Sequence, residues 1–360
     1  MTSDLVTDNR VHKVCSTLEA MGFDVLLAGR IIPSGLPLQQ RRYQTVRFRL
    51  PFHSGPLFYA SYNIRLFIFL LFSRFDLVLA NDLDTLPGGF IASGLKGKPL
   101  VYDSHEYFTE VPELVSRPLV KSIWAWIERQ IVPRLKVVYT VNESLALLFE
   151  EKYGIPFHVV RNLPSGSGDP ARQPVNPAGS GKIILYQGAV NIYRGLDKAI
   201  MAMKFLEGAE LVIAGDGDII SDLEQLVIDE GLQRKVKFLG RIPIEQLQSI
   251  TRGASVGISL EEDVGLNYHY ALPNKLFDYI QAHVPVLVTN LPEMAAVVRH
   301  YDIGKVIDST ESSALATVLS EMLENNQQRE LWKRNLKKAA LELTWENEEK
   351  VLRELFGPFL

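Results

Sequence analysis

The sequence predicts an α/β protein with two doubly wound parallel sheets, and three observations support this prediction. Helical and extended patterns alternate through almost the whole chain. The length of 360 residues exceeds one ordinary core, so we expect two domains. Residues 164–181 are rich in Pro, Gly and Ser and have almost nothing to bury, which predicts a linker. We therefore expect domains at residues 1–163 and 182–344, followed by a terminal helix at residues 345–360.

Each element follows from the period of its apolar residues. In the first half, helices are predicted at residues 10–21, 62–72, 119–131 and 143–153. Strands are predicted there at residues 23–28, 77–80, 100–102, 137–140 and 158–161. In the second half, strands are predicted at residues 183–186, 211–214, 236–239, 256–259 and 285–289. The helices between them are predicted at residues 196–205, 219–229 and 244–252, with one more before the last strand and further helices from there to the end of the chain.

The beginning of the chain departs from this alternation. A parallel sheet of this kind should start with an apolar strand before the helix at residue 10, but residues 1–10 have the pattern of a loop. Either the chain starts downstream of such a strand or the first domain lacks it. We favour the first of these interpretations.

Bulk composition excludes several classes of protein. With 47% hydrophobic and 22% charged residues, the chain is neither disordered nor fibrous. Cys15 is the only cysteine, so there is no disulfide framework and no thiolate metal cluster. No signal peptide is recognised, and the longest strongly apolar run, residues 66–72, is far shorter than the ~20 residues that span a bilayer. We expect a cytoplasmic protein that lies on a membrane if it meets one.

The net charge is only −4, but basic residues are concentrated in one stretch. Between Val25 and Phe75 there is no acidic residue. The arginines of this stretch are Arg30, Arg41, Arg42, Arg47, Arg49, Arg65 and Arg74. Such a stretch indicates an acidic neighbour, namely phospholipid headgroups, a phosphorylated substrate or nucleic acid. The alternative is a solvated basic face.

Four segments of the second half are predicted to lie at strand ends, where ligands of parallel sheets bind. They carry in turn Gly188 and Arg194, Gly215 and Gly217, Arg241, and the pair Lys275 and Asp278. Glycines let a backbone approach a ligand, and Arg and Lys neutralise phosphates. A carboxylate can accept two hydroxyl protons of a ribose. These residue types together predict a pocket for a nucleoside diphosphate.

Lys275 and Asp278 lie on the first turns of the helix that leads into the strand at residues 285–289. A helix start offers free N–H groups and a partial positive charge, which suit an anion. A lysine there is unfavourable unless something negative lies nearby. Residues 215–220, GDGDII, lack the third glycine of a dinucleotide fingerprint, and residues 94–99, GLKGKP, do not match a P-loop, so neither motif competes with this interpretation.

The order of these segments resembles the retaining group 1, family 4-like superfamily of GT-B glycosyltransferases, of the type that makes bacterial surface polysaccharides. The resemblance covers nearly the whole chain. In the first half it rests on TDNRVHK, NDLDTLPGG, YDSHEYFTEVPE, WIERQIVP and VVRNLP. In the second half it rests on YQGAVNIYRGLDKAI, IAGDGD, VKFLGR, LPNKLFDYI and TWENEEKVL. It implies two Rossmann-like domains that face a central cleft, with the terminal helix packed back on the first domain.

The resemblance also implies roles for individual residues. By position, Arg194 and Lys275 look like the residues that bind the donor pyrophosphate, and Asp278 like the one that holds the ribose. His105 resembles the histidine that faces the transferred sugar. Further donor-binding residues are Gly188, Gly215, Gly217, Arg241 and Asn274. The acceptor side is expected to contain Asp8, Asn9, Arg10 and, secondarily, Glu106.

Three positions depart from the family pattern. The family has two glutamates eight positions apart, but here the second is Asp278 and the first is Tyr270. A second basic residue, common just after the glycine of the first loop, is Ala189. Glu261 or Glu262 is a candidate substitute for the first glutamate.

The implied function is transfer of a sugar, as a retaining hexosyltransferase, from a UDP- or GDP-sugar to a glycan or lipid-linked acceptor in cell-surface polysaccharide biosynthesis. The resemblance also implies that the protein needs no metal and no cofactor beyond its nucleotide-sugar co-substrate. No nucleic-acid partner is expected. An anionic membrane surface, the inner face of the cytoplasmic membrane, is a further expected partner. The rival interpretations are a decayed nucleotide-binding subunit of the same fold and a sugar-nucleotide epimerase.

Simpler interpretations stand beside several of these assignments. His105 could be a buried histidine satisfied by the backbone, and Glu106 could only pair with Arg10 or cap a helix. Trp124 and Trp126 lie two residues apart, so one should be buried and the other exposed, as at a lipid interface. Asp82 and Asp84 resemble a metal pair but have no third ligand nearby in sequence, so we interpret them as structural.

Overall fold

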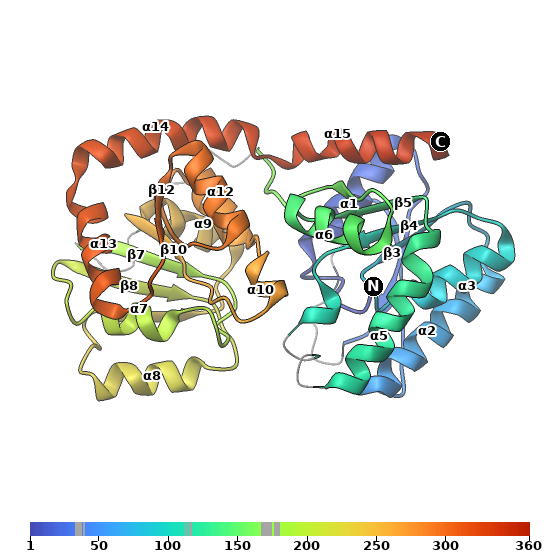
Figure 1. Ribbon diagram of the computed structural model, residues 1–360, viewed down its shortest axis with the longest axis horizontal. Helices are drawn as coiled ribbons and strands as arrows, with labels where there is room; N and C mark the ends of the chain where they lie inside the picture. Colours follow the sequence, from blue (N-terminus) through green and yellow to red (C-terminus); the bar gives the residue numbers. More distant parts are fainter. Residues whose placement is uncertain (33–37, 39, 112–113, 115–116, 167–174, 176–180) are drawn as a thin grey trace. The chain divides into compact units, whose positions relative to one another are not determined.

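The computed structural model describes the chain except residues 33–37, 39, 112–113, 115–116, 167–174 and 176–180. The chain divides into two compact units. Unit 1 comprises Met1–Asn162 and Glu348–Leu360, and unit 2 comprises Leu163–Asn347. Both are α/β structures with parallel sheets (Figure 1). Most of the predicted linker lies outside the described residues.

Unit 2 contains one parallel sheet with the strand order β12-β11-β10-β7-β8-β9. Its strands are β7 (Lys182–Gln187), β8 (Ala209–Ala214), β9 (Val236–Gly240), β10 (Val256–Ser259), β11 (Val286–Thr289) and β12 (Gly304–Ile307). The chain builds outward from β7 to β9 and then returns to the other side of β7 with β10. The strand order therefore reverses between β10 and β7, which is the place where open α/β sheets bind ligands.

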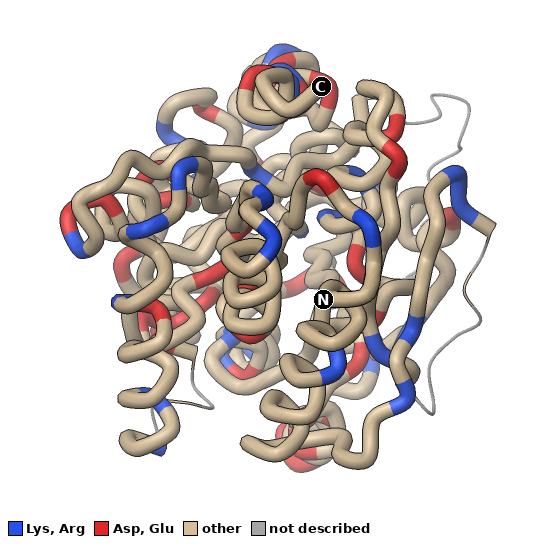
Figure 2. Tube along the Cα trace, turned by 90° about the vertical axis from the view of Figure 1, so that its right-hand side faces the viewer, with Lys and Arg blue, Asp and Glu red and all other residues tan. Residues whose placement is uncertain are grey.

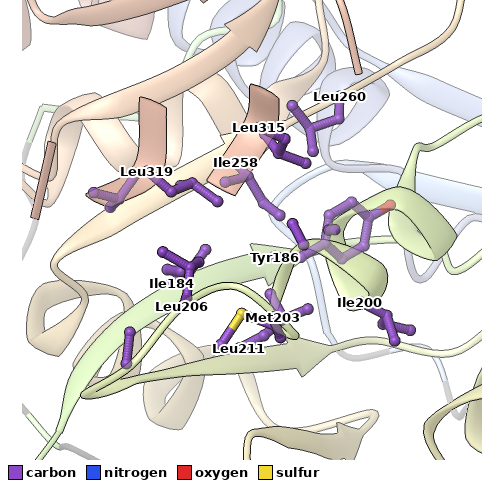
Figure 3. Close-up of a cluster of buried hydrophobic side chains, with 14 of the residues drawn as sticks. Ile184, Tyr186, Ile200, Met203, Leu206, Leu211, Ile258, Leu260, Leu315 and Leu319 are labelled. Carbon is purple, nitrogen blue, oxygen red and sulfur yellow. The ribbon is translucent and has the colours of Figure 1, made fainter. Parts of the chain in front are cut away.

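The helices of unit 2 cover both faces of this sheet (Figure 1). They are α7 (Leu196–Ala202), α8 (Ile220–Asp229), α9 (Ile244–Gly253), α10 (Leu266–His269), α11 (Asn274–Gln281), α12 (Pro292–Tyr301), α13 (Ser312–Glu324) and α14 (Asn326–Glu342). Alternate residues of a strand point to opposite faces. Ile184 and Tyr186 of β7 accordingly pack with α7, α8 and α13 (Figure 3), whereas Ile183 and Leu185 pack with α11, α12 and α14.

Unit 1 contains two parallel sheets in its described part. One pairs β1 (Leu26–Arg30) with β2 (Gln44–Phe48). The other has the order β3-β4-β5-β6, formed by β3 (Val78–Asn81), β4 (Leu100–Ser104), β5 (Val137–Thr140) and β6 (His158–Val159). The helices are α1 (Asn9–Met21), α2 (Gly55–Phe72), α3 (Leu86–Lys96), α5 (Pro118–Ile131), α6 (Glu143–Tyr153) and α15 (Trp345–Phe356).

The first three residues of α15 belong to unit 2, and from Glu348 onward the helix belongs to unit 1, where it makes polar and aromatic contacts. Arg161 Nη2 lies 2.7 Å from Glu348 Oε1, and the backbone N–H of Arg161 donates to Glu348 Oε2 over 2.7 Å. The Thr17 hydroxyl donates to Glu349 over 2.7 Å, and the Phe356 ring meets Phe23 edge to face.

Most expected elements are present within a few residues, but the strands β2 and β12 and the helices α3 and α10 were missed. β2 was hidden by its arginine-rich surroundings. α3 contains Pro87, Gly88 and Gly89, which have the pattern of a turn. A Cβ at Gly88 would lie 2.8 Å from the backbone oxygen of Asn63, so the glycine lets α2 and α3 approach closely. The missed strand β12 has a weak apolar pattern. The strand expected upstream of α1 stays a prediction.

One expectation about apolar length needs correction. α2 is an 18-residue helix with mean hydropathy 1.3, long and apolar enough to cross a membrane by length and composition. The apolar run recognised in the sequence begins only at residue 66, because Tyr62, Asn63 and Arg65 interrupt the apolar pattern before it. The helix itself begins at Gly55.

Candidate functional site

The candidate site of unit 2 forms where the strand order reverses. Gln187 ends β7 and Ser259 ends β10, and Glu261 follows Ser259 by two residues. The first residue of α11 is Asn274, with Lys275 next to it. Pro273 precedes the helix without a side-chain cap, so the first N–H groups of α11 have no such partner. The elements β7, β10 and α11 therefore bring the predicted residues Gly188, Lys275 and Asp278 to one edge of the sheet.

Glu261 is the centre of a buried ionic cluster that we call the donor cluster, formed by Glu261, Lys275, Arg194 and Ser259. Lys275 Nζ lies 2.9 Å and Arg194 Nη1 3.3 Å from the same oxygen, Oε1. The Ser259 hydroxyl donates to Oε2 over 2.6 Å. The Glu261 side chain is fully buried and that of Lys275 is 8% exposed. The negative group that a lysine at this helix start requires is thus Glu261.

Burial alone would raise the pKa of Glu261. The charges of Lys275 and Arg194, together with the hydrogen bond from Ser259, outweigh burial and hold this pKa below its ordinary value. Glu261 is therefore ionised near neutral pH. One negative charge then faces two positive charges, so the donor cluster carries a net positive charge.

Arg194 lies between two residues with left-handed backbone conformations and is incompletely paired. It follows Tyr193, whose φ of 64° is uncommon for a residue with a side chain, and precedes Gly195, whose φ is 66°. Its guanidinium lies 5.3 Å from the centre of the Tyr268 ring. Among the described residues, its buried Nε has no hydrogen-bond partner. A strained backbone and an unused donor at a strand end are typical of a ligand site.

Asp278 is oriented by residues that the sequence analysis did not identify. Gln187 Nε2 donates to Asp278 Oδ2 over 2.9 Å, and the Thr251 hydroxyl donates to Gln187 Oε1 over 2.7 Å. Thr251 and Gln187 are buried, whereas Asp278 is half-buried. The signal for Gln187 was its position directly before Gly188, at the end of a strand.

The three predicted glycines hold two loops together. Gly188 and Gly215 have φ of 126° and 148°, and a Cβ at Gly215 would lie 1.8 Å from the Gly188 oxygen. A Cβ at Gly217 would lie 2.4 Å from the Val190 oxygen. Only at Gly188 is the group nearest to an added Cβ part of the donor cluster, since Lys275 Cε would be 3.6 Å away. Gly215 and Gly217 therefore support the loop of Gly188.

Two further predicted donor residues are exposed. Arg241 is 84% exposed, and its Nε lies 3.1 Å from Asp216 Oδ2. Asn274 is exposed at the first position of α11. Neither has a contact with the donor cluster among the bonds of the described residues. Their assignment to the donor stays a prediction.

His105 belongs to a second cluster, in unit 1, which we call the histidine cluster and define as His105, Asp82, Asp103 and Arg10. His105 Nδ1 lies 3.1 Å from Asp82, and Nε2 lies 3.1 Å from Asp103. Arg10 donates to both oxygens of Asp103, over 2.7 and 3.2 Å, and to the Val160 oxygen over 2.7 Å. Carboxylates only accept hydrogen bonds, so a ring between two of them must donate from both nitrogens.

The pKa values of this cluster agree with that geometry. Burial lowers the pKa of His105, but the charges of Asp82 and Asp103 raise it well above its ordinary value. Burial raises the pKa of Asp103, whereas Arg10 and His105 lower it, to about 2. His105 is therefore an imidazolium, a fixed positive charge that cannot serve as a proton acceptor.

The remaining first-unit predictions are placed as follows. Asp8 caps α1 by accepting from the Val11 N–H over 3.0 Å, and Asn9 is exposed at the start of that helix. Arg10 is 4% exposed and is bound to Asp103, and its assignment to the acceptor side stays a prediction. Asp82 has φ 60° and holds His105. Trp124 is buried and Trp126 exposed, as predicted.

Asp84 also has a structural contact. It accepts a hydrogen bond from the Thr2 hydroxyl. Burial and the neighbouring Asp82 raise its pKa to about 7. In the described part of the chain, no group of three or more His, Cys, Asp or Glu side chains could hold a metal ion.

Two family models match the chain. The glycosyl transferase 4-like domain matches residues 7–166, and the glycosyl transferases group 1 model matches residues 169–339. Between them the two matches take in nearly the whole chain. The chain therefore belongs to the group 1 glycosyltransferases, as the resemblance implied.

Curated relatives are distant. The chain is 29% identical over 172 residues to an uncharacterized glycosyltransferase of Methanocaldococcus jannaschii, which covers 46% of this chain and 42% of the relative. It is 23% identical over 259 residues to alpha-D-kanosaminyltransferase of Streptomyces kanamyceticus, covering 67% and 65%. It is 31% identical over 136 residues to D-inositol 3-phosphate glycosyltransferase of Corynebacterium urealyticum, covering 37% and 30%. The chain thus spans less than two thirds of the length of each of these relatives.

Solved structures show the fold. The glycosyltransferase WaaG, involved in lipopolysaccharide biosynthesis, is 18% identical with a TM-score of 0.75, covering 99% of this chain and 98% of WaaG. Sucrose-phosphate synthase of Thermosynechococcus elongatus is 16% identical with a TM-score of 0.77, covering 97% and 93%. HepE of Anabaena in complex with UDP-glucose is 15% identical with a TM-score of 0.74, covering 99% and 98%. The predicted GT-B fold is confirmed.

Proposed function

We propose that the protein transfers a sugar, in our assignment a hexose, from a UDP- or GDP-sugar to a glycan or lipid-linked acceptor, with retention of the anomeric configuration. The observation that carries this proposal is the donor cluster. Two cations converge on one carboxylate oxygen beside an uncapped helix start, which leaves a net positive charge where α/β sheets bind ligands. A diphosphate fits this charge. The presence of UDP-glucose in HepE supports a UDP-sugar.

The chemistry that we propose needs no paired acid and base. The acceptor hydroxyl oxygen forms a bond to the anomeric carbon while the bond from that carbon to the diphosphate oxygen breaks. The departing oxygen, which gains the bonding electrons, takes the proton of the acceptor hydroxyl. Arg194 and Lys275 stabilise the negative charge that grows on the diphosphate, and this stabilisation lowers the barrier. Asp278, which Gln187 orients, accepts hydrogen bonds from the ribose hydroxyls.

The proposal assigns the acceptor to unit 1. We assign His105, whose charge is balanced by Asp82 and Asp103, a position near the transferred sugar, while Asp8, Asn9, Arg10 and Glu106 remain the residues assigned to the acceptor. The proposal assigns no resident metal or cofactor and no nucleic acid to the reaction. The involvement of WaaG in lipopolysaccharide biosynthesis supports a place in cell-surface polysaccharide biosynthesis, and we extend the proposal to a cytoplasmic protein at the inner face of the membrane.

The test is acceptor-dependent release of nucleotide. The protein is incubated with UDP- or GDP-sugars and a panel of glycan and lipid-linked acceptors, and product stereochemistry is read by NMR. Release that requires an acceptor, with an anomeric configuration matching the donor, supports the proposal. Tyr270 and Ala189 favour the second candidate, a nucleotide-binding subunit without activity. Tight nucleotide binding with no transfer to any acceptor would select it, and turnover of the sugar nucleotide without acceptor and without hydrolysis would select an epimerase.

A further inference from the structure

We propose that one face of unit 1, formed by the exposed sides of α2, α3 and α5, docks on an anionic lipid bilayer. This inference deepens the peripheral-membrane part of the proposed function by naming the surface. It is carried by three observations within unit 1: large apolar side chains that face solvent, a one-sided charge distribution, and the burial of the opposite side of the same helices. We call this surface the docking face.

Large apolar side chains are exposed on all three helices. On α2, Ile64, Ile68 and Phe72 are 60%, 40% and 84% exposed, and their spacing of four residues places them on one side of the helix. On α3, Ile91 and Leu95 repeat this spacing and are both more than half exposed. Contiguous exposed apolar residues of this kind mark an interaction surface.

The third helix adds an aromatic residue. Leu119, Ile123 and Trp126 of α5 are 81%, 59% and 63% exposed, and they recur at intervals of four and three residues. Trp is enriched where protein meets the interface between lipid and water, because its ring is apolar and its N–H stays hydrated.

The three helices are neighbours in unit 1 (Figure 1). The N–H of Gly88 on α3 donates to the side chain of Asn63 on α2 over 2.9 Å. The ring of Tyr59 on α2 meets that of Trp124 on α5 edge to face, with ring centres 5.4 Å apart. These contacts join the three helices, so their exposed residues lie on neighbouring elements of unit 1.

The charges of the docking face are mainly positive, and the exposed Asp76 beside it pairs with Lys98. The segments 55–75, 86–98 and 117–136 contain a single acidic residue, Glu128. Glu128 is 1% exposed and pairs with Lys152 over 3.2 Å. Arg65, Arg74 and Arg129 are exposed (Lys and Arg are blue in Figure 2). Basic residues around an apolar surface suit anionic lipid headgroups.

This charge pattern distinguishes a bilayer from other occupants. A second copy of the chain would place arginines against arginines across a symmetric interface, which is unfavourable. The basic stretch as a whole is not the determinant, because Arg30 and Arg41 are used inside unit 1. Arg30 donates to the backbone oxygens of Thr2 and His53, and Arg41 to that of Leu5 and to the Tyr43 hydroxyl.

The helix α2 cannot leave unit 1 without exposing part of the core, so in our proposal the protein lies on the bilayer and does not span it. Phe58 and Tyr62 of α2 are 4% and 0% exposed and pack against Phe48 of β2. Asn63 holds the Asp84 oxygen over 2.7 Å. A spanning α2 would expose these partners, whereas docking leaves them in place.

The experiment is sedimentation of the full chain with vesicles of phosphatidylcholine alone or mixed with phosphatidylglycerol, at low and high salt. The wild type should bind the mixed vesicles at low salt and dissociate at high salt, because salt screens exposed charges. The charge variant Arg74→Gln/Arg129→Gln should bind about 30-fold more weakly. Arg234→Gln/Arg334→Gln, at exposed sites of unit 2, is the matched control and should bind like wild type.

The apolar part has its own variant. Ile68→Ser/Phe72→Ser/Trp126→Ser should lose vesicle binding, while Phe205→Ser/Ile228→Ser/Leu341→Ser, which removes exposed apolar groups from unit 2, should keep it. Thermal unfolding checks that both variants fold. Equal binding of the wild type to neutral and mixed vesicles would overturn the proposal. Unchanged binding by the variant Ile68→Ser/Phe72→Ser/Trp126→Ser would also overturn it. A third contradicting result would be a wild-type dimer that becomes a monomer in this same variant. No sugar nucleotide is present, so vesicle binding is tested independently of transfer.

Discussion

The histidine cluster of unit 1 and the donor cluster of unit 2 are built from similar residues at the ends of parallel strands, yet they differ in charge balance. In the histidine cluster, Arg10 and the His105 imidazolium face Asp82 and Asp103, so two positive charges meet two negative charges. In the donor cluster, two cations share one oxygen of a single carboxylate. The first cluster is neutral and the second is positive.

This difference separates a cluster whose charges are balanced internally from one that has positive charge left for a ligand. Both nitrogens of the His105 ring and both oxygens of Asp103 are engaged, so the histidine cluster stabilises the unit in which it lies. The donor cluster has an excess of positive charge and an unpaired buried Nε on Arg194. Burying unpaired charge is unfavourable unless an anion completes it. We infer that an anion completes the charge balance of the donor cluster. The histidine cluster is balanced without one.

The largest expected effect comes from breaking the neutral cluster. Asp103→Asn leaves Arg10 and His105 without a shared negative partner in a buried place, which should cost about 3–5 kcal/mol in the free energy of unfolding. Urea unfolding followed by hydrogen exchange in β4 and β5 measures it. Asp76→Asn, which breaks an exposed pair with Lys98, is the control and should leave unfolding unchanged. A small effect at Asp103 would mean that the cluster is not structural.

Removing a cation from the donor cluster should affect turnover. Arg194→Ala and Lys275→Ala should each lower turnover about 10²–10³-fold, because each group contributes most when charge grows on the leaving diphosphate. Donor affinity should fall much less, since the helix N–H groups and the other cation remain. Steady-state kinetics and calorimetry measure the two quantities. Lys198→Ala, whose side chain pairs with Glu262, is a control outside the cluster.

The outcome that contradicts this assignment is an equal loss of turnover and affinity in both variants. Such a loss would indicate uniform binding, with the catalytic effect located elsewhere.

A smaller effect is expected at Asp278. Asp278→Ala removes a charged acceptor of ribose hydroxyl bonds and should weaken donor binding by about 1.5–3 kcal/mol, or roughly tenfold or more. Calorimetry with the nucleotide-sugar measures it. Because Gln187 orients Asp278, Gln187→Ala should weaken donor binding in the same direction. Unchanged affinity in Asp278→Ala would place the ribose elsewhere.

The histidine cluster also predicts a dependence of stability on pH. The pKa of His105 is raised in the folded state, so its stabilising contribution is fully present below the unfolded pKa and is lost as pH rises through the folded pKa. The pKa of Asp103 is lowered to about 2, so its contribution is present above the ordinary value of 3.8 and is lost as pH falls through about 2. Unfolding midpoints across pH test this, with His105→Gln expected to remove only the alkaline loss.

How much of this could be predicted from the sequence differs between fold and site. The strand at residues 256–259 and the helix carrying Lys275 could be predicted from the period of their apolar residues and from Pro273 before the helix. These are local signals. The helix α3 was missed since Pro87 and two glycines outweighed its apolar residues locally, while packing against Asn63 favours a helix. Local pattern cannot report such tertiary contacts.

The site shows the same limit. Lys275, Arg194 and Asp278 could be singled out because their residue types suit a nucleotide. Glu261 was only one of two candidates, since its contact with Lys275 depends on β10 returning beside β7. The pairing of Arg10 with Asp103, 93 residues away, has no local signal at all. Charge balance, which distinguishes the two clusters, therefore became visible only in the structure.

The most direct test of the claim that the donor cluster accepts an anion compares UDP-induced stabilisation in two variants. Glu261→Gln keeps the shape of the side chain but leaves Lys275 and Arg194 without a charge partner, which destabilises the protein in the absence of ligand. Because the UDP diphosphate can replace the missing charge, UDP should raise the melting temperature of Glu261→Gln by more than that of wild type. It should raise that of Asp103→Asn by the wild-type amount. A smaller UDP effect in Glu261→Gln than in wild type, or an enhanced one in Asp103→Asn, would contradict the account.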